Sequence, residues 1–292
     1  MAARFLQPAG RGRAAWLSGG CAGRAGAPRL VLGIETSCDD TGAAVLDEAG
    51  TVLGEALRSQ KDVHLKTGGI IPHVAQQLHR ENIQQVVKEA LRASGVPVNE
   101  LAAIATTVKP GLALSLEVGL QYSLQLVDRY QKPFIPIHHM EAHALTIRLT
   151  EQVEFPFLVL LLSGGHCILA VARGVSDFLL LGQSIDIAPG DMLDKVVSGG
   201  VASNQYIRKG LQTLANANGF AFLCPPPRLC TDNGVMIAWN GIERLLAGCG
   251  ILYSTDGIRY EPKAPLGIDI SKRVEEDSIK VPRLKKTQQP AC

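Results

Sequence analysis

Two segments of the chain follow the same plan of apolar runs and polar turns. Residues 30–57 read LVLGIETSCDDTGAAVLDEAGTVLGEAL, and residues 157–184 read FLVLLLSGGHCILAVARGVSDFLLLGQS. Each segment contains an apolar strand, a polar turn with Ser, a second strand, a turn with Gly and Asp, and a third strand. Because a recurring plan indicates a duplicated unit, the sequence predicts an α/β protein made of two related lobes.

The segments that follow the two triplets of strands also correspond in kind. After the first triplet, the apolar periodicity predicts, in order, a helix that begins near Val74, a strand at 103–108, a helix at 114–127, a strand at 134–139 and a helix that carries His143. After the second triplet, it predicts a strand at 196–200, a helix at 203–217, a strand at 220–226 and a helix at 232–248. We therefore expect a first lobe at 30–150, a second lobe at 151–270 and a flexible tail at 271–292.

The two lobes differ in one place. Between the third strand and the fourth lie residues 58–101 in the first lobe, but only residues 185–195 in the second. In the second lobe a helix-like segment, GDMLDK, runs into the next strand with no turn residue between them, although a helix and a strand need a short connection. This contrast indicates that the second lobe has lost a segment.

The N-terminal segment is rich in arginine and contains no acidic residue before Glu35. A leader of this kind, without a long apolar core, is typical of a mitochondrial transit peptide, so we expect residues 1–29 to direct the protein to the mitochondrial matrix. A disordered N-terminal tail is the alternative. Loss of the leader removes five arginines and turns the formal net charge of +2 negative, so a nucleic-acid partner would have to meet a local basic patch.

The composition disfavours several other classes of protein. Apolar residues make up 46% of the 292 residues, which suits a globular protein with a large core. The seven cysteines are odd in number and include no C-x-x-C pair, which disfavours a disulfide scaffold or a zinc ribbon and favours a reducing compartment. The longest apolar run, FPFLVLLL, is too short to cross a bilayer, so we expect no membrane insertion.

The segment IHHMEAHAL places His139 and His143 four residues apart at the start of a predicted helix. Two imidazoles at this spacing lie on one helix face and could share a metal ion, although such pairs also occur on solvated faces. In the correspondence between the lobes, Asp232 lies where the histidine helix begins, on the second-lobe side of the same cleft. It is the candidate third ligand, and its alternative role is an N-cap together with Thr231. A His-His-Asp set with open positions suits iron or zinc.

Two polar turns are expected to face each other across this cleft. The turns TSCDDTG (36–42) and LLSGGH (161–166) have small residues that let backbone N–H groups approach an anion, which predicts a site for nucleotide phosphates. Neither a G-x-G-x-x-G motif nor a P-loop is present. Asp39 and Asp40 in the first turn either cap it or handle a proton. Cys38 and Cys167 are interpreted as small fillers.

Eight motifs occur in order along the chain: GIETSCDDTGAAV, GGIIPHVAQQLH, VKPGLALSLEVG, HHMEAHAL, LLSGGHC, APGDMLDK, SGGVASN and PRLCTDNGVMIAWNG. Together they closely resemble the tRNA adenosine threonylcarbamoyltransferase family, also called O-sialoglycoprotein endopeptidase-like proteins. With its arginine-rich leader, the chain resembles the mitochondrial members. The resemblance implies an actin/Hsp70/sugar-kinase-like fold, in which two ribonuclease H-like domains surround a nucleotide cleft.

The resemblance also implies an activity. The threonylcarbamoyl group of threonylcarbamoyl-AMP moves to the exocyclic amine of the adenosine 3′ to the anticodon, in mitochondrial tRNAs that read ANN codons. Because this donor already carries a good leaving group, the enzyme mainly has to hold the donor, offset charge and align a weak nucleophile. We add the hypothesis that Asp39 accepts a proton from the amine.

Individual residues receive roles from the same resemblance. It implies one divalent metal ion, iron or zinc, on His139, His143 and Asp232. It implies that Asp194 is the carboxylate that binds the ribose and that Asn204 contacts the adenine. It also implies a donor-binding turn, formed by Leu161, Leu162, Ser163, Gly164 and Gly165. Whether the protein forms a homodimer is left as an open question. The candidate contacts to tRNA phosphates are Lys61, Lys66, Arg80 and Lys109, for which solvated surface side chains are the alternative.

The chain departs from the family pattern after Lys195. Family members carry roughly a hundred residues, nearly a small domain, between the DMLDK and SGGVASN motifs, whereas here these motifs nearly adjoin. The loss would expose apolar surface on the second sheet, so we expect this form to transfer weakly or not at all. An inert variant and a small-molecule kinase or ATPase of the same fold are the alternatives. A metalloprotease is disfavoured because H-E-x-x-H is absent.

Overall fold

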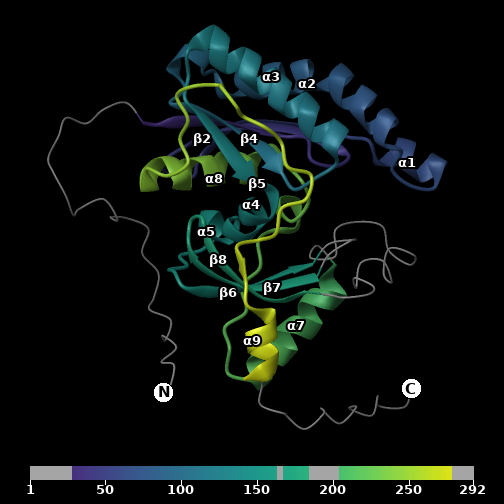
Figure 1. Ribbon diagram of the computed structural model, residues 1–292, viewed down its shortest axis with the longest axis vertical. Coiled ribbons are helices and arrows are strands. Elements are labelled where there is room, and N and C mark those ends of the chain that lie inside the picture. Colours follow the sequence, from purple (N-terminus) through teal and green to yellow (C-terminus); the bar gives the residue numbers. More distant parts are fainter. Residues whose placement is uncertain (1–27, 163–166, 184–203, 278–292) are drawn as a thin grey trace, which may run out of the picture.

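The computed structural model describes residues 28–162, 167–183 and 204–277. These residues form two lobes, each built on one mixed sheet, which follow one another along the long axis of the molecule (Figure 1). The predicted α/β fold with two sheets is confirmed. No helix in the described part of the chain combines the length and the apolar composition that a membrane crossing requires.

The first sheet has the strand order β3-β2-β1-β4-β5. Its strands are β1 (Leu30–Glu35), β2 (Asp40–Asp47), β3 (Val52–Ser59), β4 (Ala103–Lys109) and β5 (Phe134–His138). Strands β1, β2 and β3 form an antiparallel meander, whereas β4 and β5 continue the sheet parallel to β1. Strand β1 is buried along its whole length, as its continuous apolar run predicts for a central strand with both faces covered.

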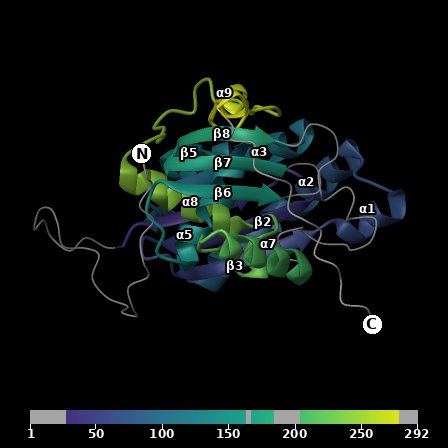
Figure 2. The same cartoon turned by 90° about the horizontal axis from the view of Figure 1, so that it is seen from below.

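Helices cover both faces of the first sheet (Figures 1 and 2). Helix α2 (Pro72–Ser94) and helix α3 (Ala113–Tyr130) pack on one face, and α8 (Gly234–Ala247) packs on the other. Helix α2 starts with Pro72 at its first position and ends at Gly95 in the left-handed conformation, as expected for residues that favour these two ends. The shorter helices are α1 (Lys61–Thr67) and the 3₁₀ helix η1 (Val98–Glu100).

Glycines allow α8 to approach the first sheet closely. A Cβ atom on Gly33 of β1 would lie 2.2 Å from the backbone nitrogen of Ala238, and one on Gly234 would lie 2.3 Å from the carbonyl carbon of Ala43. Only residues without a side chain fit such a contact between backbones. Because Gly42 of β2, which pairs with Glu35 of β1, faces the first turn of α8, the N-terminus of α8 lies beside the carboxyl end of β1.

The second sheet has the strand order β6-β7-β8-β9. Strands β6 (Phe157–Leu162), β7 (Cys167–Gly174) and β8 (Asp177–Gln183) form the predicted meander, and the short β9 (Ile268–Asp269) pairs with β8. Helix α4 (His139–Leu145), followed by α5 (Ile147–Thr150), joins the lobes, since Ala144 and Leu145 belong to the core of the second lobe. Helices α7 (Gln205–Ala217) and α9 (Ser271–Glu276) and the 3₁₀ helix η3 (Pro227–Leu229) complete the described part.

The second lobe departs from the prediction. The expected strand at 220–226 is wrong, because this segment has no regular secondary structure, and the expected strand at 196–200 lies outside the described residues. Residues 271–276 form α9 rather than a flexible tail, and α8 packs on the first sheet although it lies in the predicted second lobe. In the described part of the chain, β6 is therefore an edge strand, whereas its counterpart β1 has a neighbour on each side.

Candidate metal centre

Two histidines of α4 form the first half of the candidate centre. Helix α4 begins at His139, directly after β5, and the side chain of the preceding residue, His138, accepts a hydrogen bond from the backbone nitrogen of Met140 as an N-cap. The rings of His139 and His143 lie edge to face with centroids 4.6 Å apart, and their Nε2 atoms are 3.2 Å apart. The predicted i, i+4 pair therefore points at one place.

Asp232 completes the cluster. Its Oδ1 atom lies 3.0 Å from Nε2 of His143 and 3.4 Å from Nε2 of His139. One ligand atom from each of the three residues lies within 4.8 Å of the other two. The alternative role of Asp232 as an N-cap is wrong, because the N-cap of α8 is Asn233, whose side chain accepts from the backbone nitrogen of Met236.

The expected placement of Asp232 on the second-lobe side of the cleft is also wrong. Asp232 directly precedes α8, and α8 packs on the first sheet, so the elements that hold all three side chains pack on that sheet. The physical reason is the close glycine contact of α8 with β1 and β2. The cluster is therefore built by the first lobe, with the polypeptide returning to it from the second.

The charges in the cluster fit a cation. Burial alone would lower the pKa of His139, but Asp232 and Glu35 outweigh burial and raise this pKa well above its usual value. Burial would raise the pKa of Asp232, yet His139 and His143 hold it far below its usual range. In the metal-free protein an imidazolium thus lies between two carboxylates. A divalent ion would replace its proton and meet two imidazole nitrogens and one carboxylate oxygen, which is a donor set typical of first-row metals.

Glu35 is a residue that the sequence reasoning missed. It ends β1, has no exposed surface, and places Oε2 3.2 Å from Nδ1 of His139. Thr107 donates its hydroxyl to the same oxygen at 2.6 Å, and the backbone N–H of Ser37 donates to Oε1. Burial alone would raise the pKa of Glu35, but His139 outweighs burial and lowers it. The signal in the sequence was a single acid at the end of the apolar run LVLGIE.

The first polar turn is fastened to α3 and α2. Ser37 accepts at its carbonyl oxygen from the backbone nitrogen of Leu112, and its hydroxyl lies 3.1 Å from Nδ1 of His139. The carbonyl oxygen of Cys38 accepts from Nε2 of His79 at 3.0 Å. Burial raises the pKa of the Cys38 thiol, which agrees with its interpretation as a filler. The turn is thus held rigidly beside the histidines.

The two aspartates of this turn differ. Asp39 is partly buried, and its carbonyl oxygen accepts from the backbone nitrogen of Gln60 at 3.0 Å. Asp40 buries Oδ1 without a hydrogen-bond partner among the described residues, and burial raises its pKa to about 6. A carboxylate with a pKa near neutrality is suited to accept a proton. Asp40 is therefore a second candidate base, which favours the proton-handling role over the cap among the two roles that the sequence predicts for this turn.

The remaining predicted site residues are only partly described. Leu161 and Leu162 end β6, and Leu161 belongs to the core of the second lobe, as Leu145 does. Ser163, Gly164, Gly165 and Asp194 lie outside the described residues. Asn204 is the N-cap of α7, and its side-chain oxygen accepts from the backbone nitrogens of Tyr206 and Ile207. Its contact with adenine stays a prediction.

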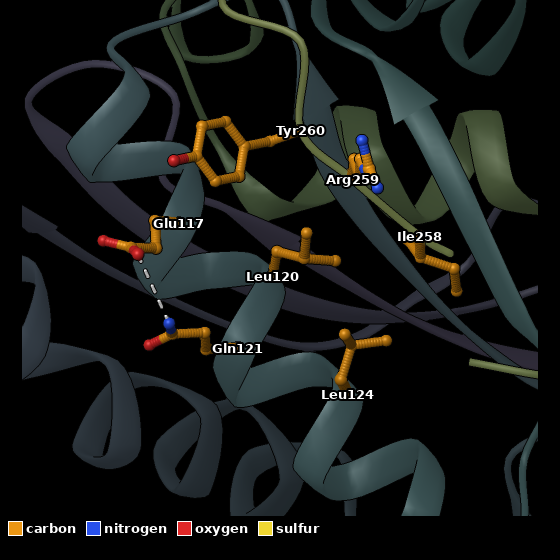
Figure 3. Close-up of a pocket in the computed structure, with 7 residues that line it drawn as sticks. All are labelled: Glu117, Leu120, Gln121, Leu124, Ile258, Arg259 and Tyr260. Carbon is orange, nitrogen blue, oxygen red and sulfur yellow. Dashed lines mark hydrogen bonds between the residues drawn. The ribbon is translucent and has the colours of Figure 1, made fainter. Parts of the chain in front are cut away.

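A separate pocket lies against the outer side of α3 (Figure 3). It measures about 490 Å³ and is lined by Glu117, Leu120, Gln121, Leu124, Ile258, Arg259 and Tyr260. Gln121 donates to Glu117 within it. None of the predicted site residues lines this pocket, so the geometry of the candidate centre does not involve it.

The fold and the cluster define a two-lobed α/β protein with a partly buried His-His-Asp centre of the type that binds metals. A sequence model described as tRNA N6-adenosine threonylcarbamoyltransferase matches residues 51–198 and 193–239. The chain belongs to the tRNA N6-adenosine threonylcarbamoyltransferase family, which confirms the resemblance of its eight motifs.

Curated relatives of this name agree with the assignment. The mitochondrial tRNA N6-adenosine threonylcarbamoyltransferase of Rattus norvegicus is 52% identical over 377 aligned residues, which cover 89% of this chain and 91% of the relative. The protein of the same name from Homo sapiens is 52% identical, over 88% of this chain and 91% of the relative. Among solved structures, YeaZ from Pseudomonas aeruginosa matches with a TM-score of 0.44 and 14% identity, over 78% of this chain and 97% of that chain.

Proposed function

We propose that this chain transfers the threonylcarbamoyl group of threonylcarbamoyl-AMP to the exocyclic amine of the adenosine 3′ to the anticodon in mitochondrial tRNA. The observation that carries the proposal is 52% identity to the mitochondrial tRNA N6-adenosine threonylcarbamoyltransferase of Rattus norvegicus, in an alignment that covers 91% of that relative. As a member of this family the protein is a mitochondrial tRNA-modifying transferase. The donor and the tRNA position are the finer parts of the proposal, and they rest on the family motifs.

The family generally binds a metal, and we assign the metal to His139, His143 and Asp232. The three donor atoms already lie within 4.8 Å of one another, and the donor set suits a divalent ion such as iron or zinc. When bound, such an ion supplies Lewis-acid stabilisation of negative charge on the donor. Glu35 accepts the Nδ1 proton of His139 and so keeps the Nε2 lone pair of this histidine directed at the site.

The transfer itself requires one proton acceptor. The amine nitrogen forms a bond to the carbamoyl carbon, the bond from this carbon to the phosphate oxygen breaks, and AMP leaves with the electron pair. The amine proton goes to a carboxylate, for which we propose Asp39. Asp40→Asn is the matched comparison for Asp39→Asn, because Asp40 lies beside it and has the raised pKa. Transfer lost only in Asp39→Asn supports this assignment, and transfer lost only in Asp40→Asn moves the role to Asp40.

The substrate contacts are further proposals. We assign the donor to the turn at 161–165, the ribose to Asp194 and the adenine to Asn204. For tRNA phosphates, Lys61 and Lys66 are exposed on α1 and Arg80 is exposed on α2, whereas Lys109 lies 3.7 Å from Glu261 and is partly neutralised. A homodimer is a separate proposal, which light scattering of the purified chain tests directly.

We also propose that the second lobe lacks an internal segment after Lys195. The two matches to the family meet at residues 193–198, and the alignment with the rat relative spans 377 residues although the chain has 292. Leu158 and Leu160 of β6 are 60% and 42% exposed, and α7 has no buried residue. An exposed sheet face and a helix with no buried residue are what the loss of a covering segment leaves.

One experiment tests both proposals. The chain, and a version with the corresponding segment of the rat relative inserted after Lys195, are each incubated with threonylcarbamoyl-AMP and unmodified mitochondrial tRNA. Mass spectrometry of the digested tRNA measures threonylcarbamoyladenosine. We expect strong modification by the restored chain and weak modification by the present one. Equal, efficient modification by both would contradict the expectation that the present chain transfers weakly. ATP-dependent phosphorylation of a small molecule without tRNA would favour the kinase alternative.

A further inference from the structure

A pair of cysteines lies next to the candidate centre without taking part in it. Cys224 and Cys230 are partly exposed and enclose the segment PPPRL, which includes η3. Pro225, Pro226 and Pro227 fix three backbone φ angles, and the backbone nitrogen of Cys230 donates to the carbonyl oxygen of Pro227 at 3.1 Å. The segment therefore turns back on itself with little remaining freedom.

The turn brings the two thiols together. Sγ of Cys230 lies 3.5 Å from the carbonyl oxygen of Pro225, the residue after Cys224, and the two thiol groups hydrogen-bond to each other. Because the turn is already closed in the reduced protein, joining the sulfur atoms costs little additional chain entropy. The geometry is that of a thiol with a second thiol within reach.

A cation stands beside this pair. Arg208 of α7 places Nη2 3.1 Å from Sγ of Cys230 and 2.7 Å from the carbonyl oxygen of Pro225. The hydrogen bond from Cys230 lowers the pKa of Cys224 by more than burial raises it, and the charge of Arg208 lowers this pKa further, to about 7. By contrast, burial raises the pKa of Cys167. A thiol that is partly exposed, next to a cation and adjacent to a resolving thiol is the kind that oxidants attack.

We propose that Cys224 and Cys230 form a redox-active pair that a peroxide converts to an intramolecular disulfide. The thiolate of Cys224 attacks one peroxide oxygen, the O–O bond breaks, and a sulfenic acid and hydroxide form. The thiol of Cys230 then attacks the sulfenic sulfur, the S–O bond breaks, and the disulfide and water form. The two sulfur atoms lose two electrons and the peroxide gains them. A dithiol reductant reverses the reaction.

The position of the pair gives this reaction a consequence. Cys230 lies two residues before Asp232, and both residues follow η3 on the way into α8. Oxidation thus fixes the backbone on one side of the carboxylate in the candidate centre, without changing any group in the centre itself.

The experiment uses the full chain, treated with hydrogen peroxide and digested with trypsin without reduction. Trypsin cuts after Lys209, Arg228 and Arg244, so it separates the two cysteines into the peptides 210–228 and 229–244. We expect these two peptides to appear joined, with the mass of two hydrogen atoms lost, and to separate after a dithiol reductant. Joining of either peptide to another cysteine in similar yield would overturn the proposal, as would the absence of the joined pair.

Single variants test the order of the two steps. Cys230→Ser should leave a sulfenic acid on Cys224 that a 1,3-dicarbonyl reagent traps, whereas Cys224→Ser should lose both the trapped adduct and the cross-link. Cys249→Ser is the matched control, since Cys249 is also partly exposed, and it should retain the full yield of the cross-link. An unchanged yield of oxidised product in Cys224→Ser would contradict the assignment of the attacking thiol. The cross-link in the digest of the wild-type chain tests the proposal even if a variant fails to fold.

Discussion

Replacing Glu35 with Gln should weaken metal binding by roughly tenfold. The carboxylate of Glu35 is fully buried and accepts the Nδ1 proton of His139 at 3.2 Å. A hydrogen bond to a charged group contributes about 1.5–3 kcal/mol and a neutral one about 0.5–1.5 kcal/mol. Gln keeps the shape and one acceptor oxygen but removes the charge, so the loss is on the order of 1–2 kcal/mol, or about 5- to 30-fold in affinity. This range overlaps the effect of removing outer partners of metal-bound histidines, about 10- to 100-fold.

The assay is an equilibrium titration of the metal-free chain with Zn²⁺ against a competing chelator near neutral pH. Glu141→Gln is the matched control, because Glu141 is also a buried carboxylate and lies on the same helix as His139, but it accepts a hydrogen bond from Nη2 of Arg244 at 2.6 Å instead of from a histidine. Glu141→Gln should cost stability and leave the affinity unchanged. Thr107→Val should weaken binding less than Glu35→Gln, since it removes only the hydroxyl that orients the carboxylate.

Nuclear magnetic resonance of ¹⁵N-labelled histidine adds a readout that a general loss of packing would not change. In the wild-type zinc form, Nδ1 of His139 should carry the proton and Nε2 should show the shift of a coordinated nitrogen. The reasoning is refuted if Glu35→Gln binds Zn²⁺ as tightly as the wild type while His143→Ala loses binding. If the wild type itself binds no Zn²⁺, the assignment of the centre fails instead.

Three further predictions concern protonation, packing and the exposed sheet. Because the pKa of His139 is raised in the metal-free protein, Zn²⁺ must displace its proton, so affinity should rise about tenfold per pH unit until the pH passes the raised pKa; titrations at several pH values check this, and a flat profile contradicts it. Gly33→Ala should cost roughly 1–3 kcal/mol in the free energy of unfolding, since its Cβ would meet the backbone of Ala238, whereas Gly182→Ala, with nothing within 4 Å, should change little; equal melting temperatures for the two variants would refute the close contact. Leu158→Ser should reduce light scattering of concentrated samples with a stability change within about 0.5 kcal/mol, because this side chain is 60% exposed; unchanged scattering would argue against an adhesive sheet face.

The first lobe was predictable from the sequence because local pattern and tertiary environment agree there. The run LVLGIE became the central strand β1, and the periodicity that places Ile83, Val86 and Val87 on one face became the buried side of α2. The second lobe was not predictable to the same degree. The apolar letters FAFL indicated a strand, but a strand is stable only with a partner, and none pairs with residues 220–226 in the described part of the chain.

The centre was predictable as a set of residue types, but not as an arrangement. The spacing of His139 and His143 determined their common direction once a helix formed. The third ligand was chosen from a presumed symmetry of the lobes, yet Asp232 arrives by another route, because α8 packs on the first sheet through Gly33 and Gly234. When backbone segments far apart in the chain pack closely, the sequence indicates this contact only by small residues such as glycine.

This arrangement predicts that metal binding and catalysis are separable in the present chain. Glu35 ends a strand of the first sheet, and the three candidate ligands lie on α4 or directly before α8, which both pack on this sheet, whereas the proposed loss after Lys195 affects the second lobe. We therefore expect the chain and its version with the restored segment to bind Zn²⁺ with the same affinity while differing strongly in tRNA modification. Titration and transfer assays on the same two preparations decide the matter. If Zn²⁺ affinity rose in step with transfer on restoring the segment, the second lobe would be part of the metal centre, and the assignment of the centre to the first lobe would be wrong.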